Sequence, residues 1–378
     1  MKKILLISFE YPTGKSYCGG VGQIVEQSRD VLLAMGYETY VLISPDFARK
    51  YPVKLLFPDD TIKHYNNLGA FLREHNWCKF GYIIHHFVNW TKELKKIMLL
   101  KGRKPKIIYH FHSILRREKE SGFRTLSHFL HNQEKMIVLA ERIICPSSYE
   151  YDNFIRYFPS FIDKVVVIEN TVETFKADRK RIEEIKRLHN IKKNDIVSLY
   201  VGRLERIKGA HILLEEAPKI LERHRHLKLF FVGRSLEKDL YKKLLSVCRK
   251  FPCQFFYKRH LEKSELFQYY YLSDIYINSS LSESFSLSTH EGAFCGSTLL
   301  LNRLPVLDKF KGAALFFEAN DGNFSNKYES LVRNRALRKE LSGRAKVIAN
   351  TFIHNNRFKN NFCKLINSFV VQSKVCSF

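Results

Sequence analysis

Two glutamates stand in the serine-rich stretch LSESFSLSTHEG, residues 281–292, directly after a strand-like segment, DIYINSS. We expect this strand to lead into a loop at 281–286 and a helix to begin near Ser286 or Ser288, either of which could cap it. Glu283 would project from the loop, and Glu291 would lie about one turn inside the helix. A carboxylate accepts paired O–H hydrogen bonds, so one suits the hydroxyls of a donor sugar and the other the two hydroxyls of a ribose. The alternative is that both are solvated surface charges.

Two cations, Arg203 and Lys208, stand in VGRLERIKG, between a strand-like and a helix-like run. A pyrophosphate leaving group gathers about two to three negative charges as its bond breaks, and it needs a metal or fixed cations to receive them. The sequence has no Asp-x-Asp motif to hold a metal, so these two side chains could take that role. Loop cations are also common on protein surfaces, and the pair alone leaves both interpretations open.

Backbone N–H groups at helix N-termini provide a second way to bind phosphate. In the second half of the chain we expect Phe285, Ser286 and Leu287 to present such groups. In the first half, EYPTGKSYCGGVG ends in glycines just before a helix-like run. Gly19 and Gly20 would let the backbone approach a phosphate or sugar without a β carbon in the way. Glycines also simply permit turns, so this loop is weak evidence by itself.

Short apolar runs rich in β-branched and aromatic residues alternate with segments of helical period, which is typical of parallel α/β units. A charged stretch at 176–193 separates two such series, while 48–77 shows no clear period. The chain of 378 residues exceeds the size of a single core, so we predict an α/β fold with two Rossmann-like, doubly wound domains. The predicted strands are 4–9, 38–43, 81–86, 106–111, 142–145 and 164–168, then 196–201, 227–232, 254–257, 275–278 and 297–301.

The formal net charge of +25 implies an anionic partner, such as nucleic acid, acidic lipid or phosphorylated small molecules. Basic and aromatic residues form no recognisable nucleic-acid module. Between Lys92 and Lys106, seven cations face only Glu93, which indicates either a solvated helix face or a membrane-surface patch. No apolar run approaches the roughly 18 residues of a spanning helix. Eight scattered cysteines favour reduced thiols and a cytoplasmic location, without a structural zinc site.

Taken together, the motifs resemble the retaining GT-B glycosyltransferases of family four, whose signature is a glutamate, seven residues and a second glutamate, here ESFSLSTHE. The GGVG loop, VGRLERIKG, HFHS, CPSS and VIENTVETF match in order and spacing. The resemblance implies a first domain at 1–173, a nucleotide-sugar-binding domain at 174–354, and a C-terminal helix at 355–378 that crosses back to the first domain. The chain departs from the family at Ser284 and Ser286, where glycines are usual, and a positive φ would be strained at serine.

The resemblance also implies a role for each candidate residue. One histidine of the first domain is expected to meet the sugar; His112 is preferred and His110 is the alternative. The histidine that is expected to meet the sugar could instead be a packing residue. The implied assignments are Arg203 and Lys208 for the donor diphosphate, Glu283 near the donor sugar, Glu291 on the ribose, Gly20 at a phosphate, His112 on the sugar from the first domain, and Asn170 before the interdomain hinge.

We therefore predict a glycosyltransferase that moves a hexose from a UDP-sugar, or alternatively a GDP-sugar, to a hydroxyl of a glycan or lipid-linked acceptor. Cell-surface polysaccharide or lipopolysaccharide synthesis is the expected setting, on the inner face of a membrane if the protein is peripheral. We expect retention of configuration, no metal, no cofactor and no nucleic acid partner. The rival functions are a nucleotide-sugar epimerase or phosphorylase on the same fold, and a non-catalytic basic surface-binding protein.

Overall fold

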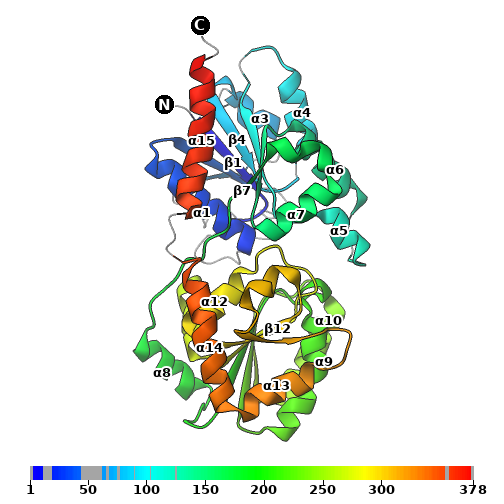
Figure 1. Ribbon diagram of the computed structural model, residues 1–378, viewed down its shortest axis with the longest axis vertical. Helices are drawn as coiled ribbons and strands as arrows, with labels where there is room; N and C mark the ends of the chain where they lie inside the picture. The colour runs from blue at the N-terminus through cyan, green and yellow to red at the C-terminus, as the bar shows by residue number, and fades with distance from the viewer. Residues whose placement is uncertain are drawn as a thin grey trace. The chain divides into compact units, whose positions relative to one another are not determined.

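A computed structural model describes residues 3–11, 19–43, 62–64, 68–74, 77–88, 90–102, 104–123, 126–353 and 357–375. The chain divides into two compact units (Figure 1). The first comprises Met1–Asn170 together with Asn356–Phe378, and the second comprises Thr171–Asn355. The C-terminal helix thus belongs to the first unit, although it follows the second in the chain.

The first unit is built on a parallel sheet of seven strands in the order β3-β2-β1-β4-β5-β6-β7. The order runs outward in both directions from β1 and β4, which are neighbours. Their side chains are almost entirely apolar and buried, as a sheet covered on both faces requires. The strands are β1 (Lys3–Ser8), β2 (Glu38–Ile43), β3 (Ile62–His64), β4 (Phe80–His85), β5 (Lys106–His110), β6 (Arg142–Cys145) and β7 (Val165–Val167).

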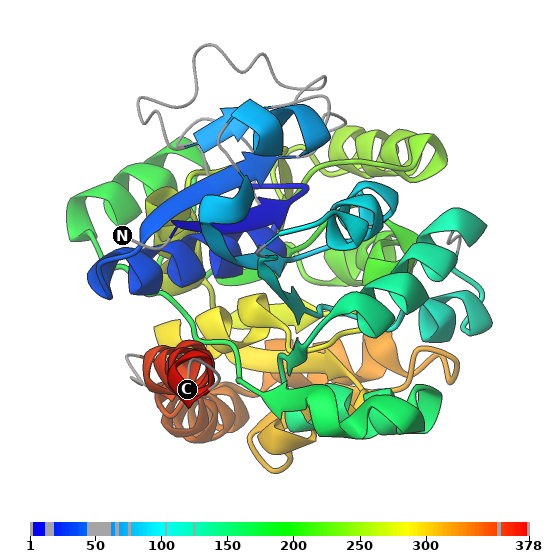
Figure 2. The ribbon, with the colours of Figure 1, turned by 90° about the horizontal axis from the view of Figure 1, so that it is seen from above.

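Helices cover both faces of this sheet. The described helical segments are α1 (Gly20–Ala34), α3 (Leu68–Glu74), η2 (Trp77–Lys79), α4 (Thr91–Leu99), α5 (Leu115–Glu120), α6 (Ser127–Leu139), α7 (Ser148–Tyr157), η3 (Pro159–Lys164) and α15 (Arg357–Val375). Gly36 follows the end of α1 and has a left-handed φ of 79°. The helix α15, seen end-on in Figure 2, packs beside α1, and its Phe369 ring lies 5.7 Å from that of Tyr82.

The second unit repeats the design with six parallel strands in the order β10-β9-β8-β11-β12-β13. The order again runs outward from two neighbours, here β8 and β11. Five predicted strands across the chain, β2, β6, β8, β9 and β11, have the predicted bounds. The strands are β8 (Ile196–Val201), β9 (Leu227–Val232), β10 (Phe255–Lys258), β11 (Ile275–Asn278), β12 (Thr298–Asn302) and β13 (Ala314–Phe317).

The helices of the second unit also lie on both faces of its sheet. The charged stretch after Asp178 forms an amphipathic helix with Ile185 buried. The described segments are α8 (Arg179–Leu188), η4 (Arg206–Lys208), α9 (Ala210–Arg223), α10 (Lys238–Lys250), α11 (Lys263–Leu272), α12 (Leu287–Cys295), η5 (Pro305–Phe310), α13 (Phe324–Arg333) and α14 (Arg335–Asn350).

The sequence did not predict β3, α3 or β13. The first two lie in the stretch 48–77, most of which is outside the described residues. The third is a short edge strand whose two middle residues are only half-buried, and its apolar run AALFF is too short to distinguish a strand from a buried helix segment. Among the described helices, none combines the length and apolar character needed to cross a bilayer.

Candidate active site

The candidate residues of the second unit follow two adjacent strands at the point where the strand order reverses. Arg203 and Lys208 follow β8, and Glu283 follows β11, its hydrogen-bonded neighbour. Open α/β sheets bind ligands at such a switch point, beyond the carboxyl ends of the strands. The topology therefore places these two loops side by side.

Lys208 and Glu283 form an ion pair, with 2.9 Å between Nζ and Oε1. The hydroxyl of Ser280 donates to the same carboxylate oxygen at 2.7 Å, which fixes the orientation of the glutamate. Behind the lysine, Gly209 has a left-handed φ of 64°, and a β carbon there would lie 1.7 Å from the carbonyl oxygen of Ser279. Only glycine fits this turn, so the backbone sets the position of the cation.

Arg203 lies in the same loop but pairs with a different acid. Its Nε lies 3.1 Å from the carboxylate of Glu205. The loop is braced by the turn after β9, because the backbone N–H of Leu204 donates to the carbonyl of Arg234. Gly233 makes the approach possible: a β carbon there would lie 1.8 Å from the carbonyl oxygen of Gly202. The backbone that carries Arg203 is thus held at the end of β8, and the guanidinium pairs with Glu205.

Ser286 precedes α12 at the N-cap position, but its side chain does not cap the helix. The prediction that Ser286 or Ser288 would cap it is therefore wrong. At φ 68° and ψ 69° Ser286 is left-handed, and its hydroxyl turns inward, 2.8 Å from both Asn278 Nδ2 and Thr289 Oγ1. The predicted strain at this serine is present, since a non-glycine residue rarely adopts a positive φ.

The turn before α12 leaves its first N–H groups without intrahelical acceptors, as at every helix N-terminus. Phe285 presents only its backbone here. Its ring is buried and stacks on His290, with 4.4 Å between ring centroids. The amides of Phe285, Ser286 and Leu287 thus stand at the carboxyl edge of β11, where an anion could accept from them.

Glu291 is the fifth residue of α12, about one turn inside the helix as predicted. Its side chain is only 4% exposed and forms an ion pair with Lys263, the first residue of α11. Lys263 was not among the residues predicted from the sequence. The signal that could have found it is its place at the start of the helix that follows β10, at the same edge of the sheet as the other candidates.

In the first unit, Gly19 and Gly20 stand at the start of α1, and residues 12–18 lie outside the described part. Glu10 was not among the predicted site residues, and its buried carboxylate accepts a hydrogen bond from the backbone N–H of Gly22 at 3.0 Å. A β carbon on Gly19 would lie 2.7 Å from the same carboxylate. Glycine at 19 therefore makes room for Glu10, and Gly20 is exposed at the helix terminus.

Three histidines, which we call the histidine cluster, gather where β4 and β5 end. His86 Nδ1 lies 3.2 Å from His112 Nε2, and the rings of His110 and His112 stack with centroids 4.9 Å apart. His86 and His110 are buried, while His112 is only half-buried. Burial lowers the pKa of His112 to about 3 and holds the pKa of the other two well below the ordinary value. All three are neutral at pH 7.

Asn170 is the last residue of the first unit. Its side chain is buried and its backbone N–H donates to the carbonyl of Pro146 at 3.2 Å. The amide oxygen has no hydrogen-bond partner among the described residues.

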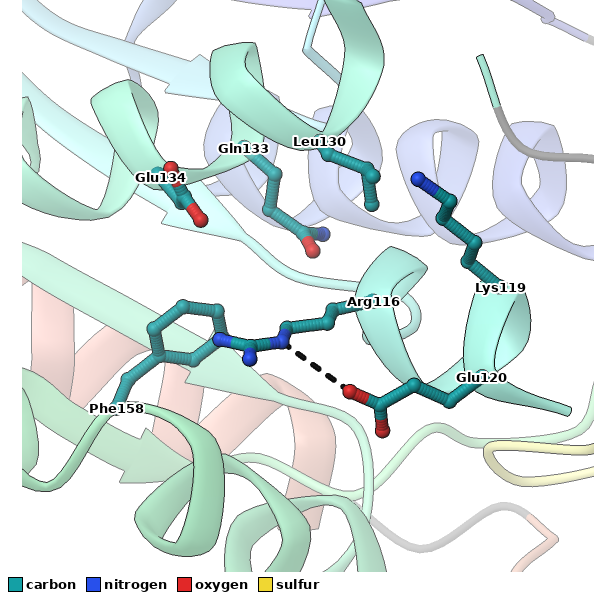
Figure 3. A pocket seen from close by; sticks show the side chains of 7 residues that line it. All are labelled: Arg116, Lys119, Glu120, Leu130, Gln133, Glu134 and Phe158. Carbon is teal, nitrogen blue, oxygen red and sulfur yellow. Dashed lines mark hydrogen bonds and ion pairs between the residues drawn. The ribbon is translucent and has the colours of Figure 1, made fainter. Parts of the chain in front are cut away.

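A pocket of about 400 Å³ lies among α5, α6 and the end of α7 in the first unit (Figure 3). Arg116 extends across it towards the ring of Phe158 and pairs with Glu120, with 3.2 Å between Nε and Oε1. It contains none of the predicted site residues, although α5 begins three residues after His112. Its lining residues are Arg116, Lys119, Glu120, Leu130, Gln133, Glu134 and Phe158.

In the part of the chain that the structure describes, no three His, Cys, Asp or Glu side chains are grouped so that they could hold a metal ion. The charged groups of the site are the two loop cations, their carboxylate partners and the pair in α11 and α12. The arrangement can therefore hold an anion beside groups that accept hydrogen bonds from hydroxyls.

Two Rossmann-like units, each with candidate residues at its switch point, define a two-domain α/β protein of the class that binds nucleotides. Residues 181–347 match the family model "Glycosyl transferases group 1", and residues 18–175 match "Glycosyltransferase Family 4". Together the two matches take in most of the chain, which belongs to this glycosyltransferase family.

Solved structures with this fold extend over nearly the whole chain. Sucrose-phosphate synthase from Thermosynechococcus elongatus aligns with a TM-score of 0.79 and 14% identity, covering 98% of this chain and 100% of its own. The Anabaena protein HepE, solved with UDP and glucose, aligns with a TM-score of 0.76 and 14% identity, covering 97% and 100%. At these identities the likeness shows the GT-B fold.

A curated relative is similar over part of its length. D-inositol 3-phosphate glycosyltransferase from Thermobifida fusca is 27% identical over 189 residues, which is 46% of this chain and 42% of the relative. The matched part thus spans less than half of that protein.

Proposed function

We propose that this glycosyltransferase moves a hexose from a UDP-sugar to a hydroxyl of a glycan or lipid-linked acceptor, with retention of configuration. The observation that carries the proposal is the pairing of Lys208 with Glu283 at the switch point, with Arg203 in the same loop. It puts a fixed cation beside a carboxylate that can accept hydrogen bonds from sugar hydroxyls. The complexes of HepE with UDP and with UDP-glucose favour uridine in the donor.

In this proposal the donor diphosphate lies against Arg203, Lys208 and the backbone N–H groups that precede α12. The bond between the anomeric carbon and the diphosphate oxygen breaks, and the electron pair leaves with the phosphate. The two cations and the amides stabilise the charge as it develops, which takes the place of a metal. The acceptor oxygen attacks from the same face, and its proton passes to the departing phosphate oxygen, so no separate base is required.

The remaining candidates position the donor. Glu291 accepts from the ribose hydroxyls, since a carboxylate takes two O–H bonds, and Glu283 accepts from the hexose. From the first unit, the half-buried His112 meets the sugar, and as a neutral ring it can donate or accept a hydrogen bond. Gly20 gives the backbone access to a phosphate, and Asn170 stands where the chain leaves the first unit.

The setting that we propose is synthesis of cell-surface polysaccharide or lipopolysaccharide at the inner face of a membrane. The formal net charge of +25 supports an acceptor held at an anionic surface.

The test is incubation of the protein with radiolabelled UDP-glucose, UDP-galactose and GDP-mannose together with lipid-linked glycans, followed by product analysis. The proposal expects label in the glycan, an α-linkage from an α-linked donor, and unchanged turnover in excess chelator. Recovery of an epimerised sugar, or of a sugar phosphate only when phosphate is added, would instead establish the rival enzymes on this fold. Stronger stabilisation by GDP than by UDP in a thermal-shift assay would overturn the assigned base.

A further inference from the structure

Two adjacent leucines stand exposed at the C-terminal end of α4. Leu99 is 76% exposed and Leu100 is 50% exposed. Leu99 is the most exposed of the large apolar side chains in the described part of the chain. A single exposed leucine is ordinary on a protein surface. Two consecutive exposed leucines at a helix end form an apolar patch, which we call the leucine pair. An exposed apolar patch of this kind is typical of a surface that binds a membrane or another protein.

Exposed lysines lie near the leucine pair in α4 and in the loop after it, and acidic side chains do not neutralise them. Among the described residues, no ion pair involves the exposed lysines of α4 and the loop after it, and the one acid of α4, Glu93, lies in its first turn. The contrast is α8, where Arg181 pairs with two glutamates and Lys186 pairs with Glu183. The unpaired lysines are Lys92, Lys95, Lys96, Lys101 and Lys104.

The fold orients α4 so that the leucine pair points away from the core. Leu94 and Ile97 of α4 are buried against the sheet. The neighbouring helix α6 packs against α4, and it ends in the same way, with Val138 59% exposed. The Lys164 ammonium donates to the carbonyl of Val138 at 2.9 Å and adds another cation there. Both helices end at the edge of the sheet where β5 and β6 begin.

We propose that this edge docks on an anionic lipid bilayer. The docking surface consists of Leu99, Leu100 and Val138 together with Lys95, Lys96, Lys101 and Lys104. The aliphatic side chains enter the headgroup region, and the ammonium groups lie against lipid phosphates, the combination that peripheral membrane proteins use. Lipid fits better than nucleic acid, because the apolar groups here are aliphatic and single strands are bound by stacking on aromatic rings.

The docking surface lies at the opposite edge of the sheet from the histidine cluster, which follows the carboxyl ends of β4 and β5. It is therefore separate from the residues that we place in the reaction. The inference rests on the proposed function only for its choice of partner, an anionic membrane that carries the acceptor. The two can fail independently, because docking needs no nucleotide-sugar and turnover of the donor needs no membrane.

The test is co-sedimentation of the full chain with vesicles of phosphatidylcholine, with or without about 40% phosphatidylglycerol. Binding should require the anionic lipid and weaken strongly between about 0.1 and 0.5 M salt. Leu99→Ser/Leu100→Ser should weaken binding about tenfold or more. Lys95→Ala/Lys96→Ala should weaken it about 25-fold, at about fivefold for each lysine. The matched control is Leu188→Ser on α8, a leucine that is 68% exposed beside paired cations, and it should bind like the wild type.

Equal binding to neutral vesicles, or undiminished binding by both double variants, would overturn the inference. So would a loss in Leu188→Ser as large as that in the leucine pair, or displacement from vesicles by short nucleic acid at equal charge. Thermal stabilisation by UDP should be the same in all four proteins, which shows that the variants are folded. Vesicle binding without any sugar transfer would reject the proposed function and leave the docking surface standing.

Discussion

Lys263 and Glu291 offer the sharpest single perturbation of the second unit. The carboxylate is 4% exposed and the lysine side chain 19%, so the charge of Glu291 has almost no water to stabilise it. Lys263→Met removes the ammonium and keeps a stem of similar length beside Phe267. Removing one partner of a buried pair costs about 3–5 kcal/mol. Because the lysine is partly exposed, water can reach the vacated position, and we expect a loss of about 3 kcal/mol.

Because both tryptophans lie in one of the two compact units, the loss of stability can be assigned to the unit in which it occurs. Trp77 and Trp90 are the only tryptophans in the sequence, and both belong to the first unit. In urea, intrinsic fluorescence therefore reports the first unit, while far-ultraviolet circular dichroism reports both. Lys263→Met should lower the midpoint of the dichroism transition that belongs to the second unit by about 1.5 M, and it should leave the fluorescence transition in place.

Two further variants separate charge from packing. Lys263→Met/Glu291→Gln removes both charges and should recover about 2 kcal/mol of the loss, since the cost lies in the unpaired carboxylate. Lys250→Met breaks an exposed pair with Glu222, whose members are 60% and 53% exposed, and should cost less than about 0.5 kcal/mol. A loss in Lys263→Met no larger than in Lys250→Met would refute the reasoning.

Three other predictions follow from backbone strain and burial. Ser286→Ala should destabilise the second unit by about 1–2 kcal/mol, because buried hydrogen bonds of the hydroxyl are lost. Ser286→Gly should destabilise it by about 1 kcal/mol less than Ser286→Ala, because glycine relieves the strain of the positive φ. A lower melting temperature for Ser286→Gly than for Ser286→Ala would contradict this prediction. Gly209→Ala should cost more than about 4 kcal/mol and Gly36→Ala only about 1 kcal/mol, since both have a positive φ but only the first meets a carbonyl oxygen, and urea midpoints compare them. The histidine cluster is neutral in the folded state with lowered pKa, so the unfolded chain binds more protons below about pH 6.5. The first unit should then lose up to about 1.4 kcal/mol per pH unit for each histidine as the pH falls further, read from tryptophan fluorescence, and a flat profile down to about pH 5 would contradict the burial of the cluster.

Much of the fold could be predicted because buried parallel strands have a simple signature. Segments such as IVSLYV and LKLFFV are mostly apolar, with one polar residue each, and charged or turn residues flank them, so their ends are marked in the sequence. Edge strands have less to bury. The strand at Ala314–Phe317 has two half-buried residues, and its apolar run AALFF is too short to distinguish a strand from a buried helix segment.

The candidate site, like the fold, could be predicted from the sequence only in part. Lys208 and Glu283 could be predicted to meet, because they follow strands whose carboxyl ends share one edge of a sheet. The partners Lys263 and Glu10 could not, because each pairing depends on where a third loop or a helix start lies in space. The strain at Ser286 was visible as a departure from a glycine motif, but the inward hydrogen bonds of its hydroxyl were not.

The claim on which the proposed function depends is that fixed cations receive the departing diphosphate. The most direct measurement is the rate of UDP release from UDP-glucose by Arg203→Ala and Lys208→Ala, with Arg206→Ala as the control. Arg206 lies in the same loop but pairs with Glu237 and Asp239 at its exposed side. We predict that kcat falls about 100-fold or more in each of the first two variants, at saturating donor, and stays near the wild-type value in the third. Turnover that is unchanged in Arg203→Ala and Lys208→Ala, in protein that melts at the wild-type temperature, would contradict the account.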